Sequence, residues 1–221
     1  MKIGILGTGM VGRAHAQKLV ELGHDVMIGT GDVDKTLNKI SENDFNSWYK
    51  NIDGLKIGAF TEAAVHGELI INAIKGEMAL AVLSLLYDGL NNKIIIDISN
   101  PLEFDEKRSV KLFVCNTDSL GEQIQKALPD SLVVKTLNTV NANLQVNPSL
   151  LSDGNHDVFV SGNNEKAKQL VAKFLKEFYG WKNIIDLGDI TTARGTEALM
   201  IMWLNLSTKF GTAMFNYKIL K

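Results

Sequence analysis

The sequence predicts an α/β fold built on a doubly wound, mainly parallel sheet, and three observations lead to this class. Short apolar runs alternate with helical patterns along nearly all of the 221 residues. Several of these runs are almost continuous in Val, Ile and Leu, as in strands that helices cover on both faces. The first run leads directly through a glycine-rich turn into a helix, which is how a β–α–β unit begins.

The apolar runs place the strands, and the polar stretches between them place the boundaries. We expect strands at 2–6, 25–28, 56–59, 69–73, 93–98, 111–114, 132–135, 157–160 and 183–186. The polar tract at 100–111 is predicted to be a loop at the sheet edge. A second polar stretch, at 141–155, suggests a dinucleotide-binding domain at 1–140 and a small fused α/β lobe at 141–221 that ends in a long helix.

Two helices of the second half are marked by their sequence. Ser119 and Glu122 form a capping box that opens a helix, and Pro129 closes it. An amphipathic helix is expected at 165–178. Its buried side would carry Ala167, Leu170, Val171, Phe174, Leu175 and Phe178.

The last helix, at about 192–215, is apolar around its full circumference at 199–204, so it must be buried on more than one side. It is a central packing helix or a homodimer interface, and both can hold for one helix. At its start Arg194 and Glu197 lie three residues apart, which predicts a local ion pair.

The turn after the first strand carries the most informative motif of the chain. It consists of Gly7, Thr8, Gly9, Met10, Val11 and Gly12. Gly7 allows the tight turn, Gly9 lets the backbone approach a pyrophosphate, and Gly12 lets helix and strand pack closely. The phosphates would lie at the helix N-terminus, where unpaired N–H groups and the helix dipole favour an anion. This context predicts a bound dinucleotide on a Rossmann-type domain.

Charge and hydropathy exclude several classes of partner. The net charge is −2 and no run of Lys or Arg occurs, which argues against nucleic acid and against an anionic membrane. The apolar run at 198–204 is far too short to span a bilayer. No charged leader precedes the first strand, and the single Cys115 excludes an internal disulfide, so a cytoplasmic protein is expected. Cys115 follows an apolar stretch and is expected to be buried.

The end of the second strand favours NADP over NAD. NAD-specific domains place a carboxylate there to bind the adenosine ribose, whereas this chain has Thr30, whose hydroxyl tolerates a 2′-phosphate. Asp32 lies near enough to serve as a ribose acceptor, which leaves the choice open. The nearby cations are Arg13 and Lys35, and Arg13 is either a phosphate ligand or a solvated helix residue.

Further segments, taken together with the glycine motif, form a pattern that is more specific than the motif alone. They are GTGMVGRA at 7–14, LGH at 22–24, DISNPL at 97–102, VVKTLNT at 133–139, GD at 188–189, and Ala193, Arg194 and Glu197. Together they resemble the family of coenzyme F420-dependent NADP reductases and its bacterial relatives. The dinucleotide domain is also similar to the cytoplasmic reductase domain of the six-transmembrane metalloreductases.

The resemblance implies an NADP(H)-dependent oxidoreductase that transfers a hydride between nicotinamide and a flavin or a deazaflavin such as coenzyme F420. The family's phosphate-loop roles carry over to Thr8, Gly9, Met10 and Val11, and its 2′-phosphate role to Thr30. Two segments would line the path from adenosine to nicotinamide: Ala73, Ile74, Lys75, Ser99, Asn100 and Pro101. Asn138 and Thr139 would face the second substrate.

Two positions depart from the family pattern. Gly31 stands where relatives often have Arg, so a ligand of the 2′-phosphate is missing and weaker discrimination between NADPH and NADH is expected. Ile74 and Lys75 stand where relatives often have Thr-Pro, which changes the wall beside the cofactor.

No acid–base group and no metal-ligand spacing are recognisable in the sequence. Lys75 is the best-placed titratable residue, and it is more simply explained as a solvated lysine. Hydride transfer between two cofactor rings fits this scarcity of acid–base groups, because the cofactors carry the reactivity.

Family resemblance favours F420 as the acceptor. F420 has a strongly anionic tail, however, and the chain has only three arginines to pair with it, Arg13, Arg108 and Arg194. This small number favours a less anionic acceptor such as FMN or riboflavin. An NADPH-dependent reductase of a small carbonyl or imine and a non-catalytic NADP(H)-binding sensor remain open.

Overall fold

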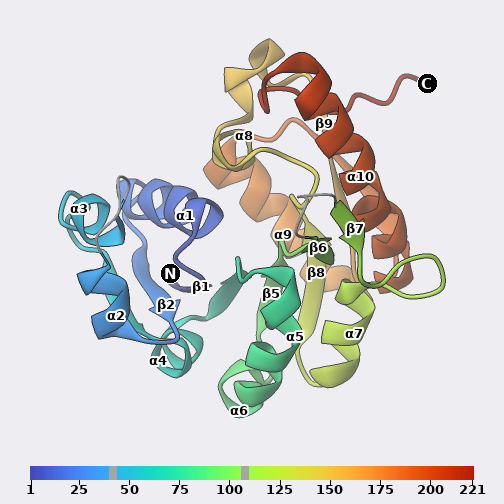
Figure 1. Ribbon diagram of the computed structural model, residues 1–221. Helices are drawn as coiled ribbons and strands as arrows, with labels where there is room; N and C mark the ends of the chain where they lie inside the picture. The colour runs from blue at the N-terminus through green and yellow to red at the C-terminus, as the bar shows by residue number, and fades with distance from the viewer. Residues whose placement is uncertain (40–43, 106–109) are drawn as a thin grey trace.

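The computed structural model describes residues 1–39, 44–105 and 110–221, and its centre is one twisted sheet (Figure 1). The order of the strands across this sheet is β10-β9-β8-β5-β4-β1-β2-β3. Their bounds are β1 Lys2–Leu6, β2 Asp25–Thr30, β3 Lys56–Ala59, β4 Leu69–Asn72, β5 Ile94–Asp97, β8 Leu132–Thr136, β9 Asp157–Ser161 and β10 Asn183–Gly188. The order places β1 at the point where the chain reverses its direction of winding, as in Rossmann-type domains.

All strand pairs in this sheet are parallel except β8 with β9, which pair antiparallel through Lys135↔Ser161 and Thr136↔Val160. Strands β9 and β10 therefore extend the same sheet with the opposite direction. The predicted class, a doubly wound and mainly parallel α/β sheet, is confirmed. The division near residue 140 falls just before this reversal and remains a prediction.

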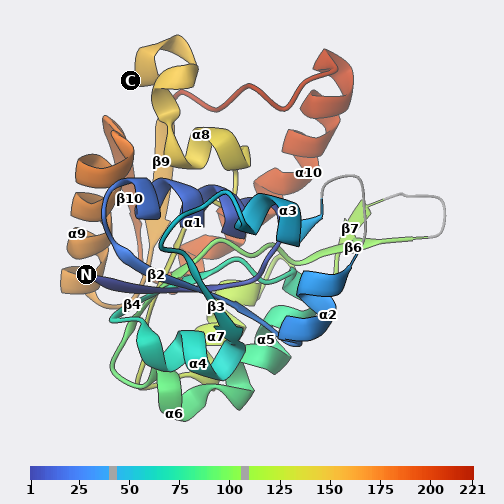
Figure 2. The same cartoon turned by 90° about the vertical axis from the view of Figure 1, so that its left-hand side faces the viewer.

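Helices cover both faces of the sheet (Figure 2). One hydrophobic cluster joins the sheet to α1, α3, α8 and α9, and a second cluster joins the opposite face to α4, α5, α6 and α7. The bounds are α1 Met10–Glu21, α2 Val33–Asn38, α3 Phe45–Tyr49, α4 Phe60–His66, α5 Gly76–Leu85, α6 Tyr87–Leu90, α7 Leu120–Ala127, α8 Ala142–Val146, α9 Glu165–Phe174 and α10 Ala193–Phe210. The N-cap expected at α7 is present, since the Ser119 side chain accepts a hydrogen bond from the Glu122 N–H. The full capping box is not formed, because the Ser119 N–H donates to Asp118 and the Glu122 carboxylate accepts from the Ser119 hydroxyl instead.

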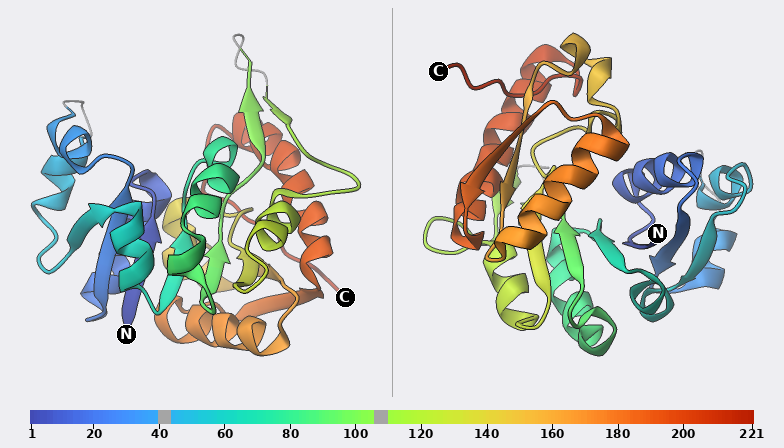
Figure 3. Two further views of the ribbon diagram at one scale, coloured as in Figure 1. Left: turned by 90° about the horizontal axis from the view of Figure 1, so that it is seen from below. Right: turned by 180° about the vertical axis from the view of Figure 1, so that it is seen from behind.

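The tract at 100–111 is not a plain loop, and that prediction is wrong. Leu102–Phe104 (β6) pairs antiparallel with Val110–Leu112 (β7), and the resulting hairpin projects from the body beside α5 and α10 (Figure 3). Leu102 and Leu112 face each other across this pair, but the charged residues between them hide the apolar alternation in the sequence. The strand expected at 111–114 is therefore a hairpin strand outside the main sheet.

Three further predictions are corrected by the structure. Leu170 on α9 is 56% exposed, although its helical spacing placed it on the buried side. Cys115 is exposed, because it lies in the turn that follows the hairpin. The last helix ends at Phe210, since Gly211 adopts a left-handed conformation with φ of 65°, which terminates helices.

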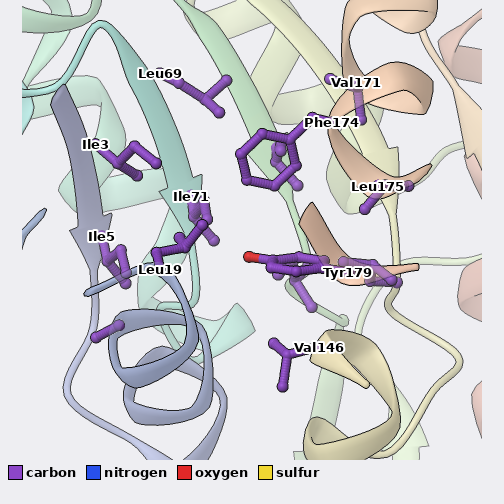
Figure 4. Close-up of a cluster of buried hydrophobic side chains, with 14 of the residues drawn as sticks. Ile3, Ile5, Leu19, Leu69, Ile71, Val146, Val171, Phe174, Leu175 and Tyr179 are labelled. Atoms are coloured by element: carbon purple, nitrogen blue, oxygen red, sulfur yellow. The ribbon is translucent and has the colours of Figure 1, made fainter. Parts of the chain in front are cut away.

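The core beside α1 packs aliphatic side chains around Tyr179 (Figure 4), and Tyr179 belongs to a buried chain of polar groups. The His15 ring lies between the Tyr179 hydroxyl, 2.6 Å from Nδ1, and the Gln145 side-chain oxygen, 2.9 Å from Nε2. The Gln145 amide nitrogen donates to the Leu137 and Val140 carbonyls, so its oxygen accepts from His15 Nε2–H and the tyrosine donates to Nδ1. Burial of this neutral ring lowers the pKa of His15 from 6.5 to about 4.

This shift predicts acid sensitivity of the fold. The unfolded chain takes up a proton on His15 below its ordinary pKa of 6.5 and the folded chain only near 4, so the associated stability is present above 6.5 and is lost as the pH falls towards 4. The loss amounts to about 3 kcal/mol. Chemical unfolding of the protein and of His15→Gln should show a stability difference that shrinks over this interval. A difference independent of pH would contradict the assignment.

Candidate functional site

The turn between β1 and α1 has the geometry that the glycine motif predicts. Gly7 has a φ of 118°, and its N–H donates to the Gly29 carbonyl at 3.0 Å. A Cβ on Gly12 would lie 1.9 Å from the Gly7 carbonyl oxygen, so only glycine permits this contact between helix and turn. Helix α1 begins after Gly9 with no side-chain cap and no acidic residue in its first turn. Its N-terminal N–H groups therefore remain available to an anion.

A groove of about 470 Å³ runs across this turn. Its wall is formed by Gly7, Thr8, Gly9, Met10, Val11, Phe60, Ala73, Ile74, Lys75, Gly76, Met78, Ile98, Ser99, Asn100, Leu102 and Phe104. The phosphate-loop segment and the two predicted lining segments thus meet in one groove at the carboxyl ends of β1, β4 and β5. A Cβ placed on Gly9 would have no atom within 4 Å, so the groove is open where a pyrophosphate would approach the backbone.

A second pocket of about 380 Å³ adjoins the groove through Thr8 and Gly9. Its remaining lining residues are Arg13, Lys35, Thr36, Lys39 and Phe45. We call it the cationic pocket, because three basic side chains line it. Thr30 is buried beneath it and its hydroxyl lies 2.8 Å from that of Thr36. The sequence pointed to two of these cations and missed Lys39, which directly follows α2.

Other predicted site residues lie beside these pockets rather than in their walls. Gly31 is exposed, and a Cβ there would contact only Phe60, at 3.6 Å. Asp32 caps α2, with its Oδ1 accepting from the Lys35 N–H at 2.8 Å. Pro101 is buried, and its carbonyl accepts from the Phe113 N–H at 3.0 Å.

Asn138 is buried and holds Asn100 by its amide group. Asn138 Nδ2 donates to Asn100 Oδ1 at 2.9 Å, and Asn100 Nδ2 donates to the Asn138 carbonyl at 2.8 Å. The preceding residue, Leu137, has a φ of 61°, an uncommon conformation for a leucine. The chain is thus bent after β8, and this bend brings Asn138 against Asn100 of the groove wall from the protein interior.

The most extensive polar network near the groove was not found by sequence reasoning. Lys135 on β8 is fully buried, and its Nζ lies 2.9 Å from Asp97 Oδ2 and 2.8 Å from Glu197 Oε1. The Glu197 oxygens also accept from the Leu120 and Gly121 N–H groups, at 2.8 and 3.0 Å, and so cap α7. Burial alone would lower the pKa of Lys135, but the two carboxylates raise it above its ordinary value.

The local ion pair predicted between Arg194 and Glu197 is wrong. Glu197 binds Lys135 and the start of α7, whereas Arg194 donates from Nε to Glu122 at 2.8 Å and from Nη2 to the same carboxylate at 2.5 Å. Both side chains prefer partners on neighbouring elements because α10 packs against α7. Each of these contacts spans more than 60 residues of sequence, beyond the reach of a spacing argument.

Among the described residues that line the groove, Lys75 is the one titratable side chain. Lys75 is exposed and forms an ion pair with Glu77 at 2.6 Å. No cluster of His, Cys, Asp and Glu in the described parts of the chain could hold a metal ion. Of the three arginines, Arg108 lies outside the described residues.

Comparison with known proteins shows which family this chain resembles. The model of the family described as NADP oxidoreductase, coenzyme F420-dependent, matches residues 2–101. A crystal structure from Arthrobacter sp. FB24, of a protein provisionally named an F420-dependent NADP reductase, is 47% identical with full coverage of both chains and a TM-score of 0.97. The chain belongs to the F420-dependent NADP oxidoreductase family. It is an NADP-dependent oxidoreductase.

Two other relatives extend this comparison. The F420-dependent NADP reductase of Methanocaldococcus jannaschii is 28% identical over 215 residues, covering 95% of this chain and 94% of that protein. Metalloreductase STEAP3 of Rattus norvegicus is 30% identical over 92% of this chain, but the chain spans only 37% of the length of that protein. None of the described helices is both long and apolar enough to cross a membrane.

Proposed function

We propose that the groove binds NADP(H), with the pyrophosphate at the start of α1 and the 2′-phosphate in the cationic pocket. The observation that supports this best is the continuity of the two pockets through Thr8 and Gly9. Arg13, Lys35 and Lys39 would bind the 2′-phosphate in place of the arginine that relatives often carry at position 31. Bound nicotinamide supplies the hydride chemistry, and the protein supplies shape and position.

We propose a flavin-type or deazaflavin ring as the electron acceptor. The nicotinamide end of the groove would be bounded by Ile74, Asn100 and the hairpin residues Leu102 and Phe104. Apolar side chains at the mouth of the groove, with Met78 55% and Phe104 50% exposed, favour a flat ring over a small polar carbonyl. Hydride transfer between stacked rings needs a shaped wall, and the proton that the reduced ring takes up on nitrogen can come from water.

A small carbonyl or imine is the second candidate substrate. The observation in its favour is Lys75, which among the described residues supplies the one ammonium group that lines the groove. Its ion pair with Glu77 would have to open before it could donate a proton to a substrate. The ring acceptor is therefore the better supported of the two.

Turnover with a panel of acceptors tests this assignment. We expect NADPH oxidation in the presence of F420, FMN or riboflavin, and little oxidation with simple aldehydes, ketones or imines. Mass spectrometry of the molecules that co-purify with the native protein identifies an acceptor that is retained. Fast turnover of a small carbonyl, with no ring-type acceptor reduced, would favour the second candidate.

We further propose that the protein is a homodimer that uses α10 and the segment after it. Met202, Phe210 and Met214 are 54%, 57% and 38% exposed, which is unusual for neighbouring large apolar side chains on a monomer. A second copy would cover them. Light scattering after size-exclusion chromatography measures the mass of the particle, and a monomer at all concentrations would contradict the proposal.

A further inference from the structure

The buried network around Lys135 reaches the groove through main-chain groups. Besides the two carboxylates, Lys135 Nζ donates to the Ser99 carbonyl at 2.5 Å, so its three protons have three acceptors. Ser99 and Asn100 are part of the groove wall. The ammonium group therefore holds one wall of the groove from the inside of the protein.

The same network holds the opposite lining segment. Asp97 Oδ1 accepts from Ser99 N–H at 3.1 Å, from the Ser99 hydroxyl at 2.7 Å and from Asn72 Nδ2 at 2.8 Å. Asn72 Oδ1 in turn accepts from the N–H of Ile74 at 3.2 Å. Both segments that flank the proposed nicotinamide end, 73–76 and 98–100, are thus tied to one ion cluster.

A role in stability alone explains this cluster poorly. Burying an ammonium and two carboxylates costs free energy that their mutual attraction only partly returns, and apolar residues of similar volume often stabilise a core as well. What apolar residues cannot do is fix the direction of main-chain carbonyl and N–H groups. The contacts of this cluster are directed at the main chain of the groove wall and at the start of α7.

We propose that Lys135 is a positioning residue for hydride transfer: held between Asp97 and Glu197, it fixes the wall at Ser99 and Asn100 against which the nicotinamide ring lies. The proposal rests on the proposed binding of NADP(H) in the groove. It places no demand on the adenosine end, because none of the atoms of the cluster lines the cationic pocket. Loss of the ammonium group should loosen the nicotinamide end and leave the adenosine end unchanged.

The test compares three variants. Lys135→Met removes the charge and keeps most of the side-chain volume. Glu197→Gln is milder, because it weakens the clamp on Lys135 but keeps one acceptor oxygen, and it decides the question if Lys135→Met does not fold. Arg194→Gln is the matched control, since it breaks the ion pair between Arg194 on α10 and Glu122 on α7 without touching the groove wall.

Two ligands report separately on the two ends of the site. Binding of 2′,5′-ADP by calorimetry reports the adenosine end, and the fluorescence of bound NADPH reports immobilisation of the nicotinamide. With the ring acceptor that the unmodified protein reduces, we expect single-turnover hydride transfer to fall by about 100-fold in Lys135→Met, the size of effect that a misplacement of about 1 Å produces. Glu197→Gln should fall less, and Arg194→Gln should resemble the unmodified protein in every readout.

The outcomes are distinct. Unchanged 2′,5′-ADP affinity with reduced NADPH fluorescence and slower transfer in Lys135→Met and Glu197→Gln supports positioning. If both variants match Arg194→Gln in fluorescence and rate, the cluster has only a structural role and the proposal is overturned. If the unmodified protein binds neither 2′,5′-ADP nor NADPH, the proposed function fails first and takes this proposal with it.

Discussion

Gly9→Asp should abolish NADPH binding while the protein stays folded. The Cβ position of Gly9 has no atom within 4 Å, so the substitution creates no clash in the protein itself. The new carboxylate would occupy the start of α1 and repel the pyrophosphate that we propose to bind there. We expect the dissociation constant of NADPH in calorimetry to rise by about 100-fold or more, because an anion–anion contact replaces charge-assisted hydrogen bonds. The melting temperature should change little.

Gly195→Asp is the matched control for this variant. Gly195 is exposed on α10, and a Cβ there also has no atom within 4 Å. The substitution adds the same charge at a similar open glycine, far along the chain from the turn. Equal NADPH affinity in the two folded variants would remove the turn at Gly9 from the site.

The double variant Lys35→Gln, Lys39→Gln should lose most of the preference for NADPH over NADH. Both lysines are exposed and line the cationic pocket, where they would bind only the 2′-phosphate that NADH lacks. A hydrogen bond between charged groups contributes about 1.5–3 kcal/mol, and hydration and salt reduce this at exposed sites. We expect the dissociation constant of NADPH to rise by about 10- to 100-fold and that of NADH to stay the same.

A second double variant, Lys166→Gln with Lys176→Gln, controls for the change in net charge. Both lysines are exposed on or just after α9, and neither lines either pocket. This control should bind both dinucleotides as the unmodified protein does. A parallel loss of NADPH and NADH affinity in the Lys35, Lys39 variant would show that the cationic pocket does not receive the 2′-phosphate. Discrimination would then have to come from Thr30 and its neighbours.

Sequence reasoning predicted well what neighbouring residues determine together. The strand, turn and helix at 2–21 and the cap of α7 at Ser119 depend on short spacings that the chain itself displays. The segments at 73–75 and 99–101 were placed together by the family resemblance, and all of their residues except Pro101 line one groove with the turn. The parallel order of the strands then follows from the alternation of strands and helices.

What sequence reasoning missed depends on contacts between distant segments. Lys135 looked like one residue of an apolar strand, and Glu197 like the partner of Arg194, yet Glu197 meets Lys135 only after α10 has packed onto α7. The hairpin at 102–112 was missed because charged residues interrupt its apolar positions. Spacing along one chain carries no information on which of several possible partners a buried charge will take.

We propose that this protein moves a hydride directly between nicotinamide and a ring acceptor, and isotope transfer follows that hydride. NADPH carrying deuterium at both positions of nicotinamide C4 is mixed with the protein and F420, and the reduced acceptor is analysed by mass spectrometry. We expect deuterium to be recovered on the carbon atom of the deazaflavin that receives the hydride. Reduced F420 without deuterium, or recovery of the deuterium on the product of a small carbonyl with neither F420 nor FMN reduced, would contradict it.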